Sequence, residues 1–299
     1  MIGKQATTFR PRKVTQACDL AADRIVAARI HEGLVDMTAV RTMGAGAITP
    51  NLTGQNIALR DVVRTGVQEA MAAIGARSRD VILIVPDAAC RLVLLEFDSL
   101  PEKPEEAQAV VRFRLKKSLP FEVERARVSF QAYPPKDGKL SVLVAVILHQ
   151  VLEEYEAVVR GAGYLPGAVL PAMIAALGQV DATIPTLVIK LDRATTSVAI
   201  VDSDRLALIR TLDNPAGTRP ESQQLAEDIY PSLVFYQDTY GTKVEKILMH
   251  GAASLPELGQ AIEEYTGVRV QELVRSERLS AAMTADRSAL GSVVGALAQ

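Results

Sequence analysis

Two aspartates stand at matching places in the two halves of the sequence. Asp19 ends the first strand that we expect in the chain, and Asp192 ends the first strand of the second half. A carboxylate in such a turn can hold Mg²⁺ through water, and hydroxyls such as those of Thr195 and Thr196 can donate hydrogen bonds. A glycine such as Gly251 lets backbone N–H groups approach a phosphate closely. A simpler role for both aspartates is to accept hydrogen bonds from nearby backbone donors.

The elements that position these residues follow the same plan in both halves. The first half predicts strands at 14–19, 24–31 and 34–43, a helix at 59–74 and a buried strand at 81–85. The second half predicts strands at 187–192, 195–201 and 206–212, a helix at 221–240, then elements at 244–249, 255–266, 268–270 and 288–297. Apolar residues at three- and four-residue spacing indicate the helices, and short apolar runs indicate the strands. Two similar lobes are therefore expected.

The pattern between the two halves predicts an α+β unit inserted into the first lobe. It consists of a strand at 91–97, a helix at 105–118, a hairpin formed by 127–133 and 139–148, and a helix at 150–161. A turn rich in proline, lysine and glycine separates the two hairpin strands. We therefore divide the chain into 1–85, the first part of lobe one, 86–163, the inserted subdomain, and 164–299, lobe two.

The duplicated plan resembles the superfamily of actin, sugar kinases and heat-shock ATPases. Within it, the chain resembles the PilM family of type IV pilus assembly proteins, which is related to FtsA. The stretches that carry this resemblance occur in the family's order, namely Val85-Pro86, Arg91–Phe97, Ser118-Leu119-Pro120-Phe121 and Ser232–Tyr236. The resemblance implies an α/β, actin-like (ribonuclease H-like) two-lobed fold with an inserted α+β subdomain. It also implies that the first turn of each lobe points at the phosphates of a nucleotide.

The turns of this chain depart from the family's nucleotide-binding pattern. Ala21 and Ala22 stand where the first turn would have glycine and hydroxyls, Ala194 replaces a glycine in the second turn, and alanines follow Gly251. We expect an alanine forced to positive φ to cost about 1–2 kcal/mol and its methyl group to obstruct the backbone. Asp23 would add negative charge beside a phosphate. ATP with Mg²⁺ is therefore disfavoured, and no cofactor is required.

Because the turns depart from the family's pattern, we expect the candidate site to have lost tight nucleotide binding. Asp19, Asp192, Thr195, Thr196 and Gly251 are interpreted as a degenerate nucleotide site. No general base paired with a water-positioning residue is visible, so we expect no catalytic residues and no enzyme activity. The three histidines are scattered, so no metal site is expected.

In the PilM family, the cytoplasmic tail of a single-span membrane partner, PilN, docks in a groove between the first lobe and the inserted subdomain. The resemblance therefore implies a scaffold of the inner-membrane platform of the pilus, with a PilN-like partner. We assign Phe113, Leu115 and Phe121 to the groove and Arg112 and Lys116 to its rim. The same basic residues also suit the helix dipole or a solvated helix face.

The composition limits the remaining classes of function. The chain has 299 residues, a net charge of -2 and 48% hydrophobic residues, which indicates a folded protein and argues against nucleic acid as a partner. No apolar run is long enough to span a membrane, and the N-terminus does not resemble a secretory signal. We expect a cytoplasmic protein that associates with the inner membrane through its partners. The alternatives are an actin-like ATPase or nucleotide-dependent switch, a type II secretion platform component, and an FtsA-like filament, in which the chain would self-associate.

Overall fold

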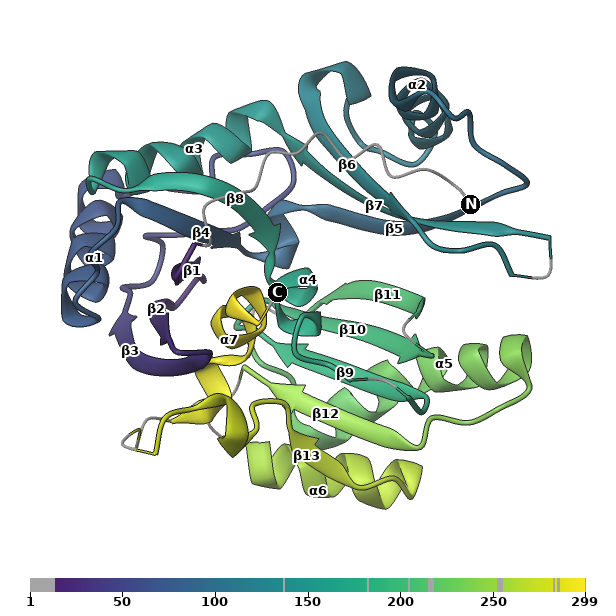
Figure 1. Cartoon of the computed structure of the whole chain (residues 1–299). Coiled ribbons are helices and arrows are strands. Elements are labelled where there is room, and N and C mark those ends of the chain that lie inside the picture. Colours follow the sequence, from purple (N-terminus) through teal and green to yellow (C-terminus); the bar gives the residue numbers. More distant parts are fainter. Residues whose placement is uncertain are drawn as a thin grey trace.

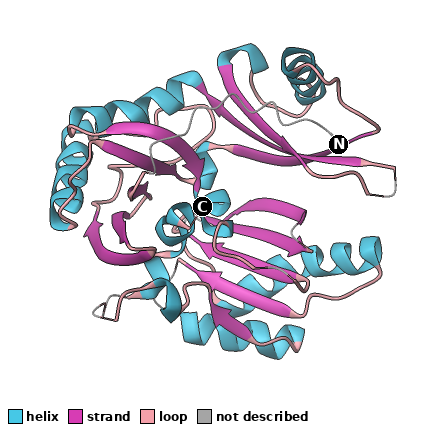
Figure 2. Cartoon of the chain, viewed as in Figure 1, coloured by secondary structure: helices cyan, strands magenta, loops and turns pink. Residues whose placement is uncertain are grey.

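The computed structural model describes residues 14–298 except 137, 182, 204, 215–217, 252–254, 282, 284 and 285. In these residues the chain forms two lobes, each built on a five-stranded sheet, and a three-stranded sheet that extends from the first lobe (Figure 1). Helices cover the outer faces of the two large sheets, and short helices lie between the lobes (Figure 2). The predicted two-lobed α/β architecture is thus confirmed.

The first sheet has the order β3-β2-β1-β4-β8. Its strands are β1 (Gln16–Leu20), β2 (Arg24–His31), β3 (Leu34–Thr42), β4 (Asp80–Val85) and β8 (Leu165–Pro171). The first three strands pair antiparallel, whereas β4 is parallel to both β1 and β8. Helices α1 (Arg60–Ala73) and α3 (His149–Gly161) share one hydrophobic core with this sheet. Every residue of the central strand β1 is buried because both faces of the sheet are covered.

The second sheet repeats this arrangement in the order β11-β10-β9-β12-β13. Its strands are β9 (Thr186–Leu191), β10 (Thr195–Asp202), β11 (Arg205–Asp213), β12 (Lys246–His250) and β13 (Val270–Glu272). Three strands again form an antiparallel meander, and two parallel strands follow. Helices α5 (Ser222–Tyr240) and α6 (Leu255–Thr266) pack on one face through a shared core. The duplication predicted from the sequence is therefore present in the sheets.

The inserted unit is an antiparallel sheet of order β5-β7-β6. It comprises β5 (Arg91–Phe97), α2 (Pro104–Leu115), β6 (Ala126–Ala132) and β7 (Leu140–Leu148), with short 3₁₀ turns at Asp87–Ala89 and Val123–Arg125. One face of this sheet packs on α2. The other face contributes Leu92 and Leu143 to a core that also contains Leu206 and Ile209 of β11. The inserted sheet therefore contacts both lobes.

Two segments that follow the insertion return to the first lobe. Strand β8 joins the first sheet beside β4, and α7 (Gly291–Leu297) packs on β1 and β2 together with α4 (Ala172–Leu177). The predicted division at residue 163 assigns β8, α4 and α7 to lobe two, although β8 is a strand of the first lobe's sheet and α4 and α7 pack against that sheet. The helix expected at 288–297 also differs, because a 3₁₀ turn at Arg287–Ala289 precedes α7.

Candidate functional site at the interlobe cleft

The central strands of both sheets end at the cleft between the lobes. Asp19 lies near the end of β1 and Asp87 follows β4, while Lys190 and Asp192 lie at the end of β9. In open α/β sheets, ligands bind outside the carboxyl ends of the strands. We call these four residues, together with Asp23, Arg24 and Arg219, the interlobe cluster. It is the largest concentration of buried charge among the described residues.

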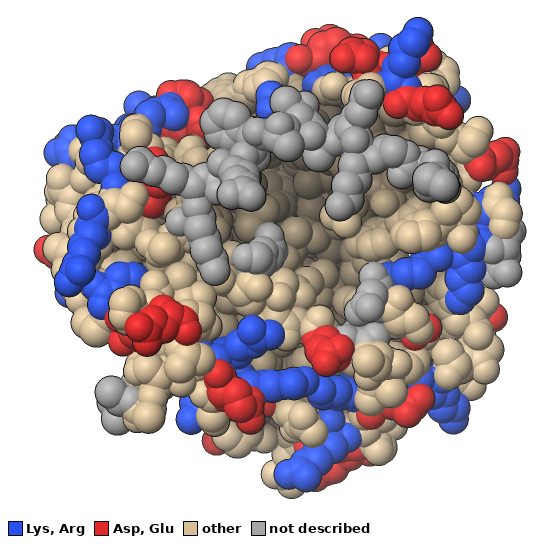
Figure 3. Space-filling view, viewed as in Figure 1, with Lys and Arg blue, Asp and Glu red and all other residues tan. Residues whose placement is uncertain are grey.

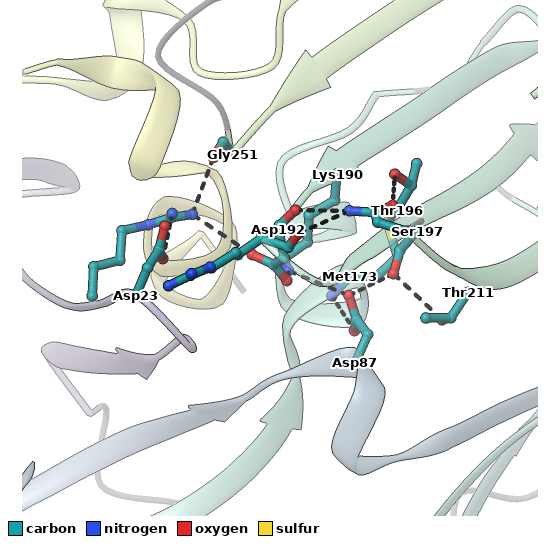
Figure 4. Close-up of polar contacts among 12 residues, drawn as sticks. Asp23, Asp87, Met173, Lys190, Asp192, Thr196, Ser197, Thr211 and Gly251 are labelled. Carbon is teal, nitrogen blue, oxygen red and sulfur yellow. Dashed lines mark hydrogen bonds and ion pairs between the residues drawn. The ribbon is translucent and has the colours of Figure 1, made fainter. Parts of the chain in front are cut away.

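Lys190 joins the two lobes at the centre of this cluster (Figure 4). It is 3% exposed, and its Nζ pairs with the carboxylate of Asp192 and lies 3.5 Å from Oδ2 of Asp87 in the other lobe. Burial alone would lower the pKa of Lys190, but the carboxylates of Asp192, Asp87 and Asp19 raise it above its ordinary value. Lys190 is therefore a permanent internal cation that neutralises carboxylates from both lobes.

Asp87 is fixed by three contacts and is itself fully buried. Its Oδ1 accepts a hydrogen bond of 2.8 Å from the backbone N–H of Met173, and its Oδ2 accepts one of 2.9 Å from the hydroxyl of Ser197. Met173 belongs to α4 and Ser197 to β10, so the carboxylate ties the end of β4 to the second lobe. A buried carboxylate needs such donors because it has lost its hydration.

A second set of contacts crosses the cleft near its entrance. One nitrogen of the Arg24 guanidinium lies 3.6 Å from Asp192 and donates to the carbonyl oxygen of Gly251 at 3.2 Å. Arg24 also pairs with Asp23 at 2.9 Å, and Arg219 of the second lobe reaches the same aspartate at 3.2 Å (Figure 4). The turn between β1 and β2 is thus held to the second lobe by charge-assisted hydrogen bonds.

The two predicted aspartates have different electrostatic environments. Burial raises the pKa of Asp19 to about 7, although Lys190 opposes this shift. Burial also disfavours the charged form of Asp192, but Lys190 and Arg24 outweigh it and hold the pKa of that carboxyl below its ordinary value. Asp192 is therefore an anion near neutral pH, whereas Asp19 holds its proton to much higher pH than an ordinary aspartate. The simpler role that we considered for both aspartates, acceptance of hydrogen bonds from nearby backbone donors, is not observed for Asp192, whose carboxylate pairs with Lys190 and Arg24.

Two of the other predicted cleft residues, Thr196 and Gly251, already have hydrogen-bond partners inside the protein. Thr195 and Thr196 are buried in β10, and the hydroxyl of Thr196 donates to Oδ1 of Asn214 at 2.7 Å. The N–H of Gly251 donates to the carbonyl oxygen of Ser288 at 2.6 Å. Gly251 has a φ of +102°, and a Cβ atom there would overlap the backbone of Leu191, so only glycine fits. Ala252 and Ala253, which follow it, lie outside the described residues.

The backbone and the ion pairs of these turns differ from what we expected. No alanine of the first two turns has a positive φ, because Glu32 and Ser203 are the only non-glycine residues with positive φ in the described part of the chain. Ala21, Ala22 and Ala194 are therefore unstrained in this structure, and the expected cost applies only to a turn that a nucleotide would force to positive φ. Asp23 also does not present an isolated negative charge, since Arg24 and Arg219 both pair with it.

Lys190 and Asp87, which lie at the centre of the cleft, were not predicted as site residues. Lys190 lies within the strand predicted at 187–192, and Asp87 lies between the strands predicted at 81–85 and 91–97; the sequence assigned no role to either residue. A lysine within a strand of otherwise apolar residues is a detectable signal, because lysine is almost never fully buried unless it is paired. The cations Arg24 and Arg219 had no comparable local signal, since their partners are remote in the sequence.

The residues predicted to bind a partner do not form one surface. Phe113 is 76% exposed, but Leu115 is fully buried because it follows Ala107 and Val111 on the apolar side of α2. Leu115 is therefore a core residue, and its assignment to the groove is wrong. Arg112 donates to two carbonyl oxygens of the following turn, Lys116 pairs with Glu124 at 2.7 Å, and Phe121 packs partly buried against the core.

A groove does lie between the first lobe and the inserted sheet, formed by different residues. Its volume is about 610 Å³, and β8 lines one side while β6, β7 and α3 line the other. We call it the β8 groove; its exposed members include Arg127, Ser129, Gly167 and Ala168. Figure 3 shows a hollow of uncharged residues near the middle of one face, with acidic and basic side chains interspersed around it.

The described residues contain neither a cluster of metal-binding side chains nor a helix suited to span a membrane. No group of three or more His, Cys, Asp or Glu side chains in this part of the chain is arranged to hold a metal ion. Within the same residues, no helix combines the length and the apolar character that crossing a membrane requires.

Comparisons with known proteins identify the fold. No family model and no curated protein matches the sequence of this chain. A chain of the PilM–PilN type IV pilus biogenesis complex is similar in structure, with a TM-score of 0.80, 16% identity, and coverage of 96% of this chain and 97% of that chain. The cytoplasmic domain of EpsL, an inner-membrane component of the type II secretion system of Vibrio cholerae, matches with a TM-score of 0.51 and 12% identity over 88% of this chain and 98% of that one.

A protein of Bacteroides thetaiotaomicron described as having an actin-like ATPase fold matches with a TM-score of 0.53 and 8% identity, over 93% of this chain and 96% of that chain. At sequence identities this low, the structural similarity establishes a shared fold and nothing beyond it. The chain therefore has the actin-like ATPase fold that the sequence predicted, and it resembles PilM in structure over nearly its whole length.

Proposed function

We propose that this protein is a cytoplasmic scaffold of a type IV pilus inner-membrane platform and that it docks the cytoplasmic tail of a PilN-like membrane protein. The observation that carries the proposal is the agreement with a chain of the PilM–PilN complex, at a TM-score of 0.80 over 96% of this chain. The inserted sheet and both lobes are included in that agreement. The protein would then lie at the inner membrane through its partner.

The β8 groove suits an extended tail. It is about 610 Å³ in volume, which is within the usual range for binding sites. Its exposed residues are small or polar where β8 lines it, at Gly167 and Ala168, so a backbone can approach closely. A tail that becomes ordered only on binding gains modest affinity for the area it buries, as is common for adjustable assemblies.

The interlobe cluster supports a role without nucleotide turnover. Lys190 already neutralises Asp87 and Asp192, and Thr196 and Gly251 already have internal hydrogen-bond partners. A triphosphate would add negative charge beside these aspartates and would have to displace existing contacts. In this proposal the protein is a pseudo-ATPase, whose lobes are held together by their own ion pairs.

One observation favours the alternative of a nucleotide-dependent switch. Among the described residues, Nε of Arg24, Oδ1 of Asp192 and Nε2 of His250 are buried without a hydrogen-bond partner, and all three belong to residues of the cleft. Unpaired buried polar atoms cost free energy, so a polar ligand that satisfied them would bind favourably. The equivalent component of a type II secretion platform is a further alternative, since the EpsL domain has the same fold.

The docking proposal is tested with fluorescently labelled peptides from the cytoplasmic tails of small single-span membrane proteins encoded beside this chain. We expect one tail to bind saturably, as measured by fluorescence anisotropy. Ser129→Trp should weaken that binding at least about tenfold, because Ser129 is exposed in the β8 groove and a tryptophan would fill it.

Thr42→Trp is the matched control, since Thr42 is also an exposed strand residue but lies on β3, outside that groove. It should bind the tail as the unmodified protein does. Equal weakening by both substitutions, or the lack of saturable binding by any neighbouring tail, would contradict the proposal.

A further inference from the structure

A second groove lies between two strand edges that face each other. Strand β5 is the edge of the inserted sheet, and β11 is the edge of the second lobe's sheet. Among the described residues, no backbone hydrogen bond joins these two strands, although both line one groove of about 710 Å³. We call it the edge groove; it is lined by Cys90–Leu94, Ala207–Leu212, Pro231 and Phe235.

The floor and one wall of the edge groove are apolar. Leu92 and Ile209 belong to the core between the inserted sheet and the second lobe, so they close the groove from below. Phe235 of α5 lines the groove and is 50% exposed, which is unusual for a large apolar side chain next to a cavity. The edge groove therefore has apolar surface available to a partner.

The charges of the edge groove all have one sign. Arg91 and Arg210 line it and are exposed, whereas no residue of the lining is acidic. In the described part of the chain, neither arginine forms an ion pair, and the guanidinium of Arg210 donates only to the hydroxyl of Ser232, at 3.2 Å. Unpaired arginines beside an apolar floor complement an occupant that carries both carboxylates and apolar side chains.

The backbone of both edges imposes a further requirement on the occupant. An edge strand presents a row of N–H and C=O groups that an added strand can pair with. Because side chains alternate along a strand, an added strand can direct apolar residues to the floor and carboxylates to the arginines. The stretch of β11 in the lining, Ala207–Leu212, would span about 20 Å, at about 3.3 Å per residue.

We propose that the edge groove binds an extended acidic segment of a partner protein, which adds as a strand to the edge of β11 that lines the groove. The occupant alternates apolar and acidic residues over about six positions. This surface is separate from the β8 groove of the proposed function, because the two linings share only Cys90. The inference therefore does not depend on docking of a membrane-protein tail.

The test uses labelled model peptides of about seven residues and the full chain. The probe alternates valine and aspartate; a second peptide has lysine in place of aspartate, and a third is the first peptide with alternate backbone nitrogens methylated. We expect saturable binding of the acidic peptide, and binding at least about tenfold weaker for each of the other two. The lysine peptide tests the charge of the occupant, and the methylated peptide tests pairing with the strand edges.

Substitutions in the protein locate the site. Arg91→Glu should weaken binding of the acidic peptide about tenfold or more, whereas Arg114→Glu, an exposed arginine on α2 outside the edge groove, should leave it unchanged. Equal binding of the acidic and lysine peptides, or of the methylated peptide, would overturn the proposal. So would concentration-dependent self-association that Arg91→Glu abolishes, because the occupant would then be a second copy of this chain.

Discussion

Replacing Lys190 by methionine probes the ion pairs that join the two lobes. Methionine keeps most of the side-chain length and removes the charge, so Asp87 and Asp192 lose their shared cation. Lys190 has a side-chain exposure of 4% and Asp87 of 0%, so solvent screens this interaction little. Removing one partner of a buried ion pair typically costs about 3–5 kcal/mol, because the remaining charge is buried without compensation. We expect Lys190→Met to lower the free energy of unfolding by about this amount at pH 8.

The loss should depend on pH in a defined direction. Lys190 lowers the pKa of Asp192, so the stability that this aspartate contributes is present above its unfolded pKa and is lost as the pH falls. In Lys190→Met, protonation relieves the buried carboxylates. The difference in stability between the two proteins should therefore be largest at pH 8 and should decrease toward pH 4.

Urea-induced unfolding, followed by far-ultraviolet circular dichroism at several pH values, measures these differences. Lys117→Met is the matched control, because Lys117 is exposed, and it should change stability by no more than about 0.5 kcal/mol. The double variant Lys190→Met/Asp192→Asn should recover part of the loss, since one uncompensated charge is removed. A loss below about 1 kcal/mol, or a loss that is the same at pH 8 and pH 4, would refute the role of Lys190.

Three further predictions concern single positions. Burial raises the pKa of Asp19 to about 7, so the folded protein binds this proton more tightly than the unfolded chain, and the free energy of unfolding should fall by up to about 4 kcal/mol as the pH rises from about 4 to about 7. Asp19→Asn should lack this decrease when unfolding is measured at several pH values, and a pH profile equal to that of the unmodified protein would contradict the raised pKa. Leu115→Ala should lower the free energy of unfolding in urea by about 2–5 kcal/mol, because Leu115 is fully buried, whereas Phe113→Ala, at an exposed position, should change it by less than about 1 kcal/mol. Equal losses of stability in the two variants would show that Leu115 is not in the core. Gly251→Ala should cost at least about 2 kcal/mol in the same assay, since its Cβ would overlap the backbone of Leu191 at a positive φ, and an unaffected variant would mean that the turn can adjust.

The sheets were predictable from the sequence because their signals are local. The strands of both meanders are short apolar runs divided by turns, and their predicted ranges agree with β1–β3 and β9–β11 to within about two residues. Strand β8 was missed, since Pro166, Gly167 and Pro171 argue against a strand. It is the edge strand of its sheet, where prolines are tolerated.

The candidate site was predictable only in part. The positions of Asp19 and Asp192 at the ends of strands indicated the cleft, which the structure places between the lobes. The cations that neutralise them could not be derived from local pattern, because Arg24 meets Gly251, and Arg219 meets Asp23, across long stretches of sequence. Leu115 was a different kind of error, since its four-residue spacing from Val111 already indicated the buried face of α2.

Titration with a fluorescent ATP analogue in the presence of Mg²⁺ tests most directly whether the cleft is held closed by its own ion pairs. We predict no saturable binding up to near-millimolar analogue, because Lys190 and Arg24 already neutralise the aspartates and a triphosphate would displace these contacts. Saturable binding in the micromolar range that requires Mg²⁺ and is lost in Asp192→Asn would contradict the account and favour a nucleotide-dependent switch.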